Sequence, residues 1–304
     1  MMRPARAGRI LLSADHGGHM IKLVLSDLDN TLIPHKPGEP FGDASLSDQG
    51  FEAIRALLDA GGRFGPVTGR SPSSMVETFP DAPWAYSTGA YANGQLVCVD
   101  GEAIHKEWTP VEPLQRVSDI LDEQPDGFLV FFDMDGDGPN WGVSRKYRMD
   151  QVSEGDFLRV SRILPEVPEP TLKVIVRLHR HESTLRIYDL LRAEVPELDF
   201  VLPSPDATVI DITPKGYGKG SAVRIMATAL GLAPDEVAVF GDADNDISML
   251  QAVPNSVAVA NASPGAAAAA HWHIADALED SVAQAIAQIA EATARGAMPS
   301  FMDE

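Results

Sequence analysis

Short apolar runs that end in acidic residues mark two of the strands expected in this chain. Residues 23–25 are followed by Asp27 and Asp29, and residues 237–240 are followed by Asp242. A continuous apolar run is typical of a strand that is buried on both faces of a parallel sheet. The acidic residues then lie at the carboxyl ends of their strands, which is where open α/β sheets bind ligands.

Helical periodicity alternates with these strands. Apolar residues recur at helical spacing from residue 51 to residue 58, and Gly61 ends that segment. Ser45 is a candidate N-cap for this helix, with Asp48 at the third position. A second helix is expected to begin near Lys219, after a glycine-rich turn. Strands and helices in alternation predict an α/β fold with a doubly wound, mostly parallel sheet.

The pattern changes between residues 92 and 214. Helical spacing appears there at residues 111–123 and 182–194, among strand-like runs at 128–132, 172–178 and 208–212. Strands with few helices between them indicate an α+β module inserted into the α/β unit. We therefore expect three parts. Residues 1–20 form a flexible N-terminal extension, residues 21–91 and 215–304 form a discontinuous catalytic core, and residues 92–214 form an α+β cap domain.

Composition and charge narrow the class of partner. The 304 residues include 24 Lys and Arg against 44 Asp and Glu, a net charge of −20 that repels nucleic acid phosphates and anionic membranes. Neither is expected as a partner, and no apolar run approaches the roughly 20 residues of a membrane helix. A single cysteine, Cys98, excludes an internal disulfide and predicts a reducing, cytoplasmic location.

The acidic strand ends predict a metal site. Asp27 and Asp29 lie two positions apart, so in an extended segment both carboxylates point to the same side and repel each other unless a cation lies between them. This arrangement favours Mg²⁺. A D-x-D segment on its own is also common in turns and helix caps, so the interpretation depends on the segments downstream.

Three downstream segments favour phosphate chemistry. Thr68 supplies a hydroxyl and Gly69 exposes backbone N–H groups, a combination that suits a phosphate although it also occurs in ordinary turns. Lys219 at a helix start opposes the helix dipole, which makes sense if its ammonium reaches a bound phosphate. Asp242 is followed by Asn245 and Asp246 at the second acidic strand end.

Taken together, four segments carry a specific resemblance. They are D-x-D-x-T at 27–31, T-G-R at 68–70, Lys219, and G-D-x-x-N-D at 241–246, with the insertion between the second and third. Over about residues 21 to 292 the chain resembles hydrolases of the haloacid dehalogenase (HAD) superfamily. Its insertion resembles that of the type IIB branch, which includes Cof-type sugar phosphatases and sucrose-phosphate phosphatase.

The resemblance implies a role for each matching residue. Asp27 would be the nucleophile that takes the phosphoryl group, and Asp29 would protonate the leaving oxygen and then activate water. Thr68, Gly69 and Lys219 would hold the phosphoryl oxygens. The remaining roles concern the cation: Mg²⁺ would be bound by Asp27, Asp242 and the Asp29 carbonyl, with Asn245 and Asp246 supporting the metal and the lysine.

The expected activity is Mg²⁺-dependent hydrolysis of a small phosphorylated metabolite, such as a sugar phosphate, through an aspartyl-phosphate. A phosphomutase or phosphotransferase would keep the same four segments, and a phosphate-sensing protein without turnover is a third possibility that the retained catalytic groups disfavour. Four cations of the insertion are candidate contacts to the leaving portion of the substrate, although a solvated strand face also explains them: Arg145, Lys146, Arg148 and Arg177.

Overall fold

The structure is a computed structural model. It describes most of the chain, namely residues 20–35, 45–132, 134, 140–151, 160–203 and 207–302. The predicted N-terminal extension therefore lies, apart from Met20, outside the described residues.

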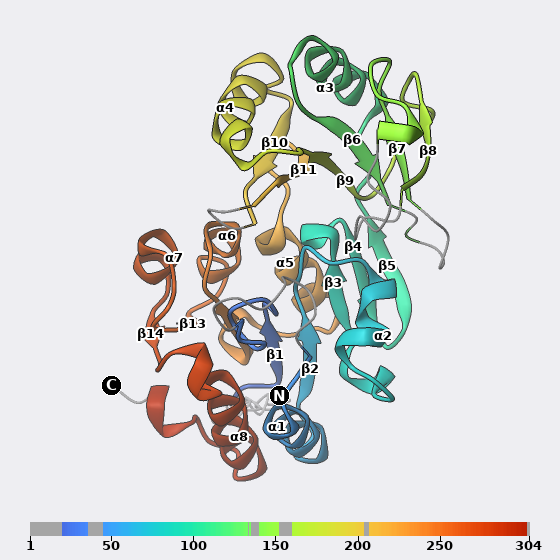
Figure 1. The fold of residues 1–304 in the computed structure, drawn as a ribbon. Helices are drawn as coiled ribbons and strands as arrows, with labels where there is room; N and C mark the ends of the chain where they lie inside the picture. The colour runs from blue at the N-terminus through green and yellow to red at the C-terminus, as the bar shows by residue number, and fades with distance from the viewer. Residues whose placement is uncertain are drawn as a thin grey trace, which may run out of the picture.

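A five-stranded parallel sheet forms the lower half of the molecule in Figure 1. Its order is β14-β13-β12-β1-β2, and the central strand β1 pairs with β12 and β2 in parallel, with Leu23 opposite both Val237 and Arg63. The expected α/β class with a mostly parallel sheet is confirmed. The strands are β1 (Leu23–Ser26), β2 (Arg63–Pro66), β12 (Val237–Gly241), β13 (Asn255–Ala258) and β14 (Trp272–His273).

Helices cover both faces of this sheet because its strands are apolar on both sides. Val24 packs with α1 and α8, whereas its neighbours Leu23 and Leu25 pack with α5 and α6 on the opposite face. Side chains alternate across a strand, so the continuous run supplies both cores. The helices are α1 (Asp48–Asp59), α5 (Lys219–Ala229), α6 (Ile247–Leu250), α7 (Pro264–Ala269) and α8 (Ser281–Ala294).

The start of α1 differs from the sequence expectation. The helix begins at Asp48, and its N-cap is Ser47, whose Oγ accepts from the Gly50 N–H at 3.0 Å. Ser45 lies outside the helix and is exposed. Gly50 packs closely on the Leu46 side chain in the first turn of this helix.

A six-stranded, mostly antiparallel sheet forms the upper half of Figure 1, in the order β10-β11-β9-β6-β7-β8. Both of its helices pack on one face, against Leu129, Val176 and Ile210. The expected cap limits at residues 92 and 214 remain predictions. The elements are β6 (Phe128–Phe131), β7 (Asn140–Val143), β8 (Val160–Leu164), β9 (Val174–Arg177), β10 (Leu198–Val201), β11 (Val209–Pro214), α3 (Val111–Glu123) and α4 (Thr184–Glu194).

A small antiparallel sheet lies beside β2 and links the two larger sheets. It consists of β3 (Gly89–Tyr91), β4 (Leu96–Val99) and β5 (Glu102–Lys106), and Ala90 bridges to Val67 just beyond the end of β2. A short helix, α2 (Met75–Thr78), precedes it. Within the described part of the chain, no helix is long and apolar enough to cross a bilayer.

Candidate active site

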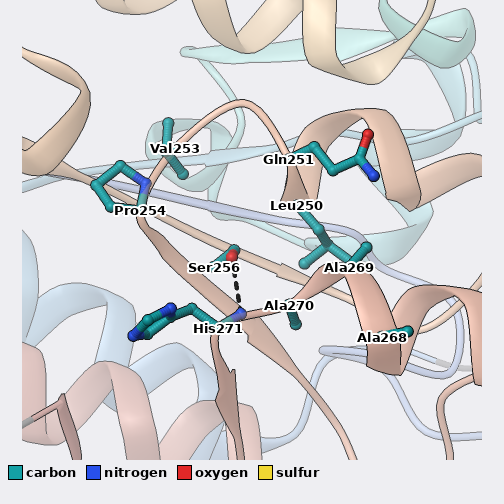
Figure 2. Close-up of a pocket in the computed structure, with 9 residues that line it drawn as sticks. All are labelled: Leu250, Gln251, Val253, Pro254, Ser256, Ala268, Ala269, Ala270 and His271. Carbon is teal, nitrogen blue, oxygen red and sulfur yellow. Dashed lines mark hydrogen bonds between the residues drawn. The ribbon is translucent and has the colours of Figure 1, made fainter. Parts of the chain in front are cut away.

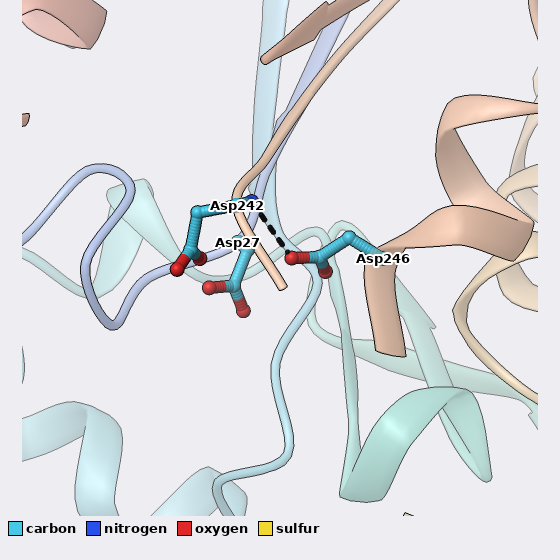
Figure 3. Close-up of side chains that lie close together, drawn as sticks. All are labelled: Asp27, Asp242 and Asp246. Carbon is cyan, nitrogen blue, oxygen red and sulfur yellow. Dashed lines mark hydrogen bonds between the residues drawn. The ribbon is translucent and has the colours of Figure 1, made fainter. Parts of the chain in front are cut away.

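Two acidic strand ends meet at one edge of the parallel sheet. Asp27 follows β1 and Asp242 follows β12, and the two strands are hydrogen-bonded neighbours; the Asp27 N–H donates to Phe240 O at 2.9 Å. Parallel strands end at the same edge of a sheet, so the register of β1 and β12 brings both carboxylates together. Figure 3 shows them side by side, with Asp246 approaching from the turn before α6.

The three carboxylates form a buried cluster. Ligand oxygens of Asp27, Asp242 and Asp246 all lie within 4.8 Å of one another, and the residues are 6%, 8% and 0% exposed. The Asp246 carboxylate is fixed by the backbone, because its Oδ2 accepts from the Asp242 and Ala243 N–H groups at 3.0 Å each. Its orientation therefore depends on the turn rather than on a ligand.

Lys219 is the cation of this cluster. Its Nζ donates to Asp27 Oδ1 at 2.6 Å and to Asp246 Oδ1 at 2.5 Å, and the residue is 1% exposed. Burial opposes the charged form of the lysine, but Asp246 and Asp27 outweigh it and raise the pKa of Lys219. The ammonium stays charged and is aimed at Asp27.

The cluster contains three carboxylates and one lysine, and the pKa values of Asp27 and Asp242 are raised. Burial raises the pKa of Asp27 well above its usual range, opposed by the Lys219 ammonium and reinforced by the Asp246 and Asp242 carboxylates. Burial likewise raises the pKa of Asp242 to about 7, with Asp246 adding to the rise. A cation between the carboxylates would relieve both effects.

The donor set fits a hard divalent cation. Asp242 Oδ1 accepts from the Thr31 hydroxyl at 2.7 Å, which orients the carboxylate and leaves its Oδ2 for a ligand. Asn245, one residue before Asp246, has a buried Oδ1 without a hydrogen-bond partner among the described residues, so it is a further free acceptor in this turn. Carboxylate and amide oxygens are the ligands that Mg²⁺ prefers.

Asp29 does not join the cluster but forms a second one that sequence reasoning missed. Arg70 donates to its carboxylate twice, through Nε at 3.0 Å and Nη2 at 2.5 Å, and His35 Nε2 lies 2.8 Å from Asp29 Oδ1. Burial opposes ionisation, but the hydrogen bonds with His35 and Arg70 outweigh it and lower the pKa of Asp29 to about 2. Arg70 belongs to the T-G-R segment, which was the only signal for this contact.

The T-G-R segment lies at the end of β2, beside Asp27. Thr68 is buried, its N–H donates to Ala90 O at 2.9 Å, and its Oγ1 accepts from the Arg70 N–H at 3.1 Å. The hydroxyl hydrogen is left to donate elsewhere. Thr68 therefore offers a buried donor at the same sheet edge as the acidic cluster.

The candidate cations of the insertion contact their own sheet and its helices. Arg145 pairs with Asp119 of α3 at 2.7 Å, and Lys146 donates to Gln124 O. Arg177 Nη1 donates to Leu178 O at 2.5 Å and to Thr208 Oγ1 at 2.7 Å. Arg148 is exposed. The structure thus groups the core residues at one sheet edge, whereas Arg145, Lys146 and Arg148 follow β7 and Arg177 ends β9, and their assignment to substrate stays a prediction.

A separate hollow of about 370 Å³ lies near the other end of the parallel strands (Figure 2). Gln251, Ser256 and His271 contribute its polar groups, and the His271 N–H donates to Ser256 Oγ at 3.1 Å. None of its lining residues belongs to the acidic cluster. The chemistry-bearing groups therefore gather at the carboxyl ends of β1, β2 and β12 instead.

Comparisons with known proteins agree on a family. Residues 24–286 match the sequence model of the haloacid dehalogenase-like hydrolases. The pyridoxal phosphate phosphatase YbhA of Escherichia coli is 40% identical over 285 residues, which cover 87% of this chain and 97% of that protein.

Solved structures show the same fold. A protein from Streptococcus mutans superposes with a TM-score of 0.72 at 21% identity, covering 88% of this chain and 97% of that one. A sugar phosphatase of HAD subclass IIB, BT4131, gives a TM-score of 0.69 at 22% identity, covering 87% and 97%.

Proposed function

Because the chain belongs to the haloacid dehalogenase-like hydrolases and is a phosphatase, we propose that it hydrolyses a small phosphomonoester with Mg²⁺, through a phosphoryl group carried on Asp27. One observation carries the proposal. The Lys219 ammonium is buried and held against Asp27, at a sheet edge where Asp242 and Asp246 complete an acidic cluster. A buried cation beside a buried carboxylate suits a dianionic phosphoryl group that must reach that carboxylate.

Asp27 acts as nucleophile in this proposal. One of its oxygens attacks phosphorus while the bond from phosphorus to the leaving oxygen breaks, so the phosphoryl group moves to the carboxylate. Water then attacks phosphorus and releases inorganic phosphate, and Asp27 is regenerated as a carboxylate. Lys219 holds Asp27 Oδ1, which leaves Oδ2 to react.

Asp29 moves the protons of both steps. It gives a proton to the leaving oxygen and later takes one from the attacking water. In the structure its carboxylate is engaged by Arg70 and His35. These contacts lower the pKa of Asp29 and keep it ionised, so proton delivery requires Asp29 to exchange these partners for the substrate and to take up a proton from solvent first.

The other residues bind and orient. Thr68 and Lys219 donate to the phosphoryl oxygens, together with the Gly69 N–H, and Asp246 fixes Lys219. Mg²⁺ would be held by Asp27, Asp242 and the Asp29 carbonyl, near Asn245, and when bound it neutralises charge on the transferring group.

Pyridoxal 5′-phosphate is the substrate we place first. The relative named for that substrate is 40% identical over most of both chains, whereas the structural match to the sugar phosphatase, at 22% identity, concerns the fold alone. Sugar phosphates are the second class of substrate that we propose. The lone cysteine supports a cytoplasmic site of action.

A phosphate-release screen tests the proposal. Pyridoxal 5′-phosphate, sugar and polyol phosphates, nucleotides and p-nitrophenyl phosphate would each be incubated with the protein and Mg²⁺. We expect release from at least one physiological ester, and free alcohol rather than a new phosphate ester as co-product. A rearranged or transferred ester would favour the phosphomutase or phosphotransferase alternative, and no turnover on any substrate would favour a phosphate-sensing protein.

A further inference from the structure

Lys173, which lies just before β9 in the second sheet, reaches the T-G-R segment of the parallel sheet. It is 8% exposed, its Nζ donates to Gly69 O at 2.5 Å, and it lies over the Phe132 ring at 4.8 Å. Burying an ammonium is costly unless it is paired and hydrogen-bonded. The contact with a backbone carbonyl beside Thr68 is therefore specific rather than incidental.

The carbonyls of the T-G-R segment all have donors. Thr68 O accepts from the Asn93 N–H at 2.9 Å and Arg70 O from the Ala92 N–H at 3.0 Å. Those two donors are backbone groups next to β3. Gly69 O, between them, receives its hydrogen bond from Lys173. The middle peptide of the segment is thus oriented by a side chain of the second sheet.

The direction of this peptide decides what Thr68 can do. Gly69 C=O and Arg70 N–H belong to one planar trans peptide and point in opposite directions. Because Lys173 holds the carbonyl on one side, the N–H points to the other, where it donates to Thr68 Oγ1 at 3.1 Å. That bond occupies a lone pair of the hydroxyl oxygen and leaves its hydrogen for an acceptor.

We propose that Lys173 is a positioning residue for phosphoryl binding: through the Gly69–Arg70 peptide it sets the direction of the Thr68 hydroxyl. The inference rests on the proposed role of Thr68 as a phosphoryl-binding group. If Lys173 has this role, the affinity for the phosphoryl group depends on the position of the second sheet. Sheet position and phosphate affinity are then coupled through one hydrogen bond.

A carboxylate pairs with this ammonium. Asp211 of β11 lies 3.5 Å from Lys173 Nζ, and its other oxygen accepts from Asn93 Nδ2 at 2.8 Å. Gly69 favours this approach, because a Cβ there would lie 3.1 Å from Asp211 Oδ2 and 3.3 Å from Asn93 Oδ1 and both side chains would have to shift. A side chain at position 69 would therefore push against the pair of side chains that holds Lys173 in place.

A double-mutant cycle with Thr68→Val tests the proposal, with the affinity for inorganic phosphate in Mg²⁺ measured by calorimetry. Lys173→Met should weaken phosphate binding by about tenfold or more, as expected for a charge-assisted hydrogen bond. In the Thr68→Val background the same substitution should change the affinity less than about twofold, since no hydroxyl is left to orient. Equal losses in both backgrounds, or no loss in the first, would overturn the proposal.

Two further variants separate positioning from folding. Lys173→Met leaves Asp211 without its ammonium, so Lys173→Met with Asp211→Asn removes the pair together and should reproduce the loss of affinity in a stably folded protein. Lys215→Met removes the lysine of an exposed pair with Asp199 and should leave phosphate binding unchanged. If the double variant restored affinity, the unpaired carboxylate would be the cause and the positioning role would be contradicted.

The cycle also distinguishes this inference from the proposed function. A wild-type protein that binds phosphate but hydrolyses no ester would contradict the function, while the cycle on phosphate affinity would still decide the role of Lys173. A protein that hydrolyses esters but shows additive effects would retain the function and lose this inference.

Discussion

Lys219 contacts two carboxylates of a cluster that contains three, and this imbalance is the main electrostatic feature of the site. Carboxylates buried at this distance repel one another unless they share a cation or a proton. A divalent cation would bring the cluster close to neutrality and allow Asp27 and Asp242 to stay ionised. The acidic cluster therefore favours a bound divalent cation.

Metal dependence is the first prediction at the residue scale. Mg²⁺ should raise the thermal midpoint of unfolding of the wild-type protein, because it binds the folded state. Asp242→Ala should abolish this rise and reduce turnover at least about a hundredfold, since the metal loses a ligand beside a dianionic ester. Scanning calorimetry with and without Mg²⁺ measures the first effect. Full activity of the wild type in excess chelator would refute a metal role.

A second prediction concerns the proton donor. Asp29→Asn should lower kcat strongly for an alkyl phosphate, because an alkoxide leaving group needs a proton, and much less for p-nitrophenyl phosphate, whose leaving group is already stable as an anion. The difference should be at least about tenfold. Rates for a series of esters with leaving groups of graded pKa measure it. Equal losses along the series would mean that Asp29 has a structural role only.

At the scale of elements, the close contact of Gly220 with Ser248 fixes the N-terminus of α5. A Cβ at Gly220 would collide with the backbone carbonyl of Ser248, just inside α6, whereas a Cβ at Gly218 would lie 3.6 Å from Ser248 Oγ. The close approach of α5 and α6 is what brings Lys219 and Asp246 together. Because the obstacle at Gly220 is backbone, it cannot be relieved by a rotamer change.

These two glycines give a matched pair of variants. Gly220→Ala should displace the start of α5 and with it Lys219, destabilising the protein by about 1–3 kcal/mol and reducing turnover at least about tenfold. Gly218→Ala should leave both nearly unchanged, because its backbone is extended and its surroundings are open. Denaturant unfolding and steady-state rates check the pair. Equal tolerance of both alanines would show that the α5–α6 contact does not set the site.

The strand ends were predictable because their signals are local. Apolar runs that stop at Asp27 and Asp242 need only periodicity and the rule for parallel sheets, and the pairing of β1 with β12 then brings the acids together. The predicted cap of α1 was wrong by two residues, because Ser45 and Ser47 are chemically equal and both precede the apolar positions of the helix. Local chemistry alone cannot select between identical residues.

Contacts between distant segments were not predictable. Arg70 meets Asp29 across 41 residues, which depends on side-chain geometry at the ends of the paired strands β1 and β2, and Lys173 meets Gly69 across 104, which depends on how two sheets pack. Lys173 left one trace in the sequence, as a charged residue inside the apolar run 172–178. That pattern also fits an edge position exposed to solvent, and only the structure shows that the lysine is buried.

At the scale of the whole molecule, recognition of the substrate should be divided between the two large sheets. The groups around Asp27 can contact only the phosphoryl group, which every phosphomonoester shares. Discrimination between esters must then come from residues that contact the leaving portion. The second sheet lies over the carboxyl ends of the parallel strands in Figure 1, and we propose that it supplies these residues.

The cations of that sheet give the prediction at this scale. If Arg148 or Arg177 contacts a polar leaving portion, its replacement by Met should raise KM for the preferred ester by roughly tenfold to a hundredfold, the loss expected for a charge-assisted hydrogen bond. The KM for p-nitrophenyl phosphate should hardly change. Steady-state kinetics on both esters measure the contrast. Equal changes would assign these cations to the fold or the surface of the sheet.

The phosphoryl group on Asp27 is the central claim, and rapid-quench labelling tests it most directly. The wild-type protein, mixed with a phosphate ester labelled in the phosphoryl group and quenched in acid within one turnover, should carry the label on the peptide that contains Asp27. Asp27→Asn should carry no label and should lose turnover at least about a thousandfold while keeping its unfolding midpoint. A label on another residue, or a wild type that turns over without ever becoming labelled, would contradict the account.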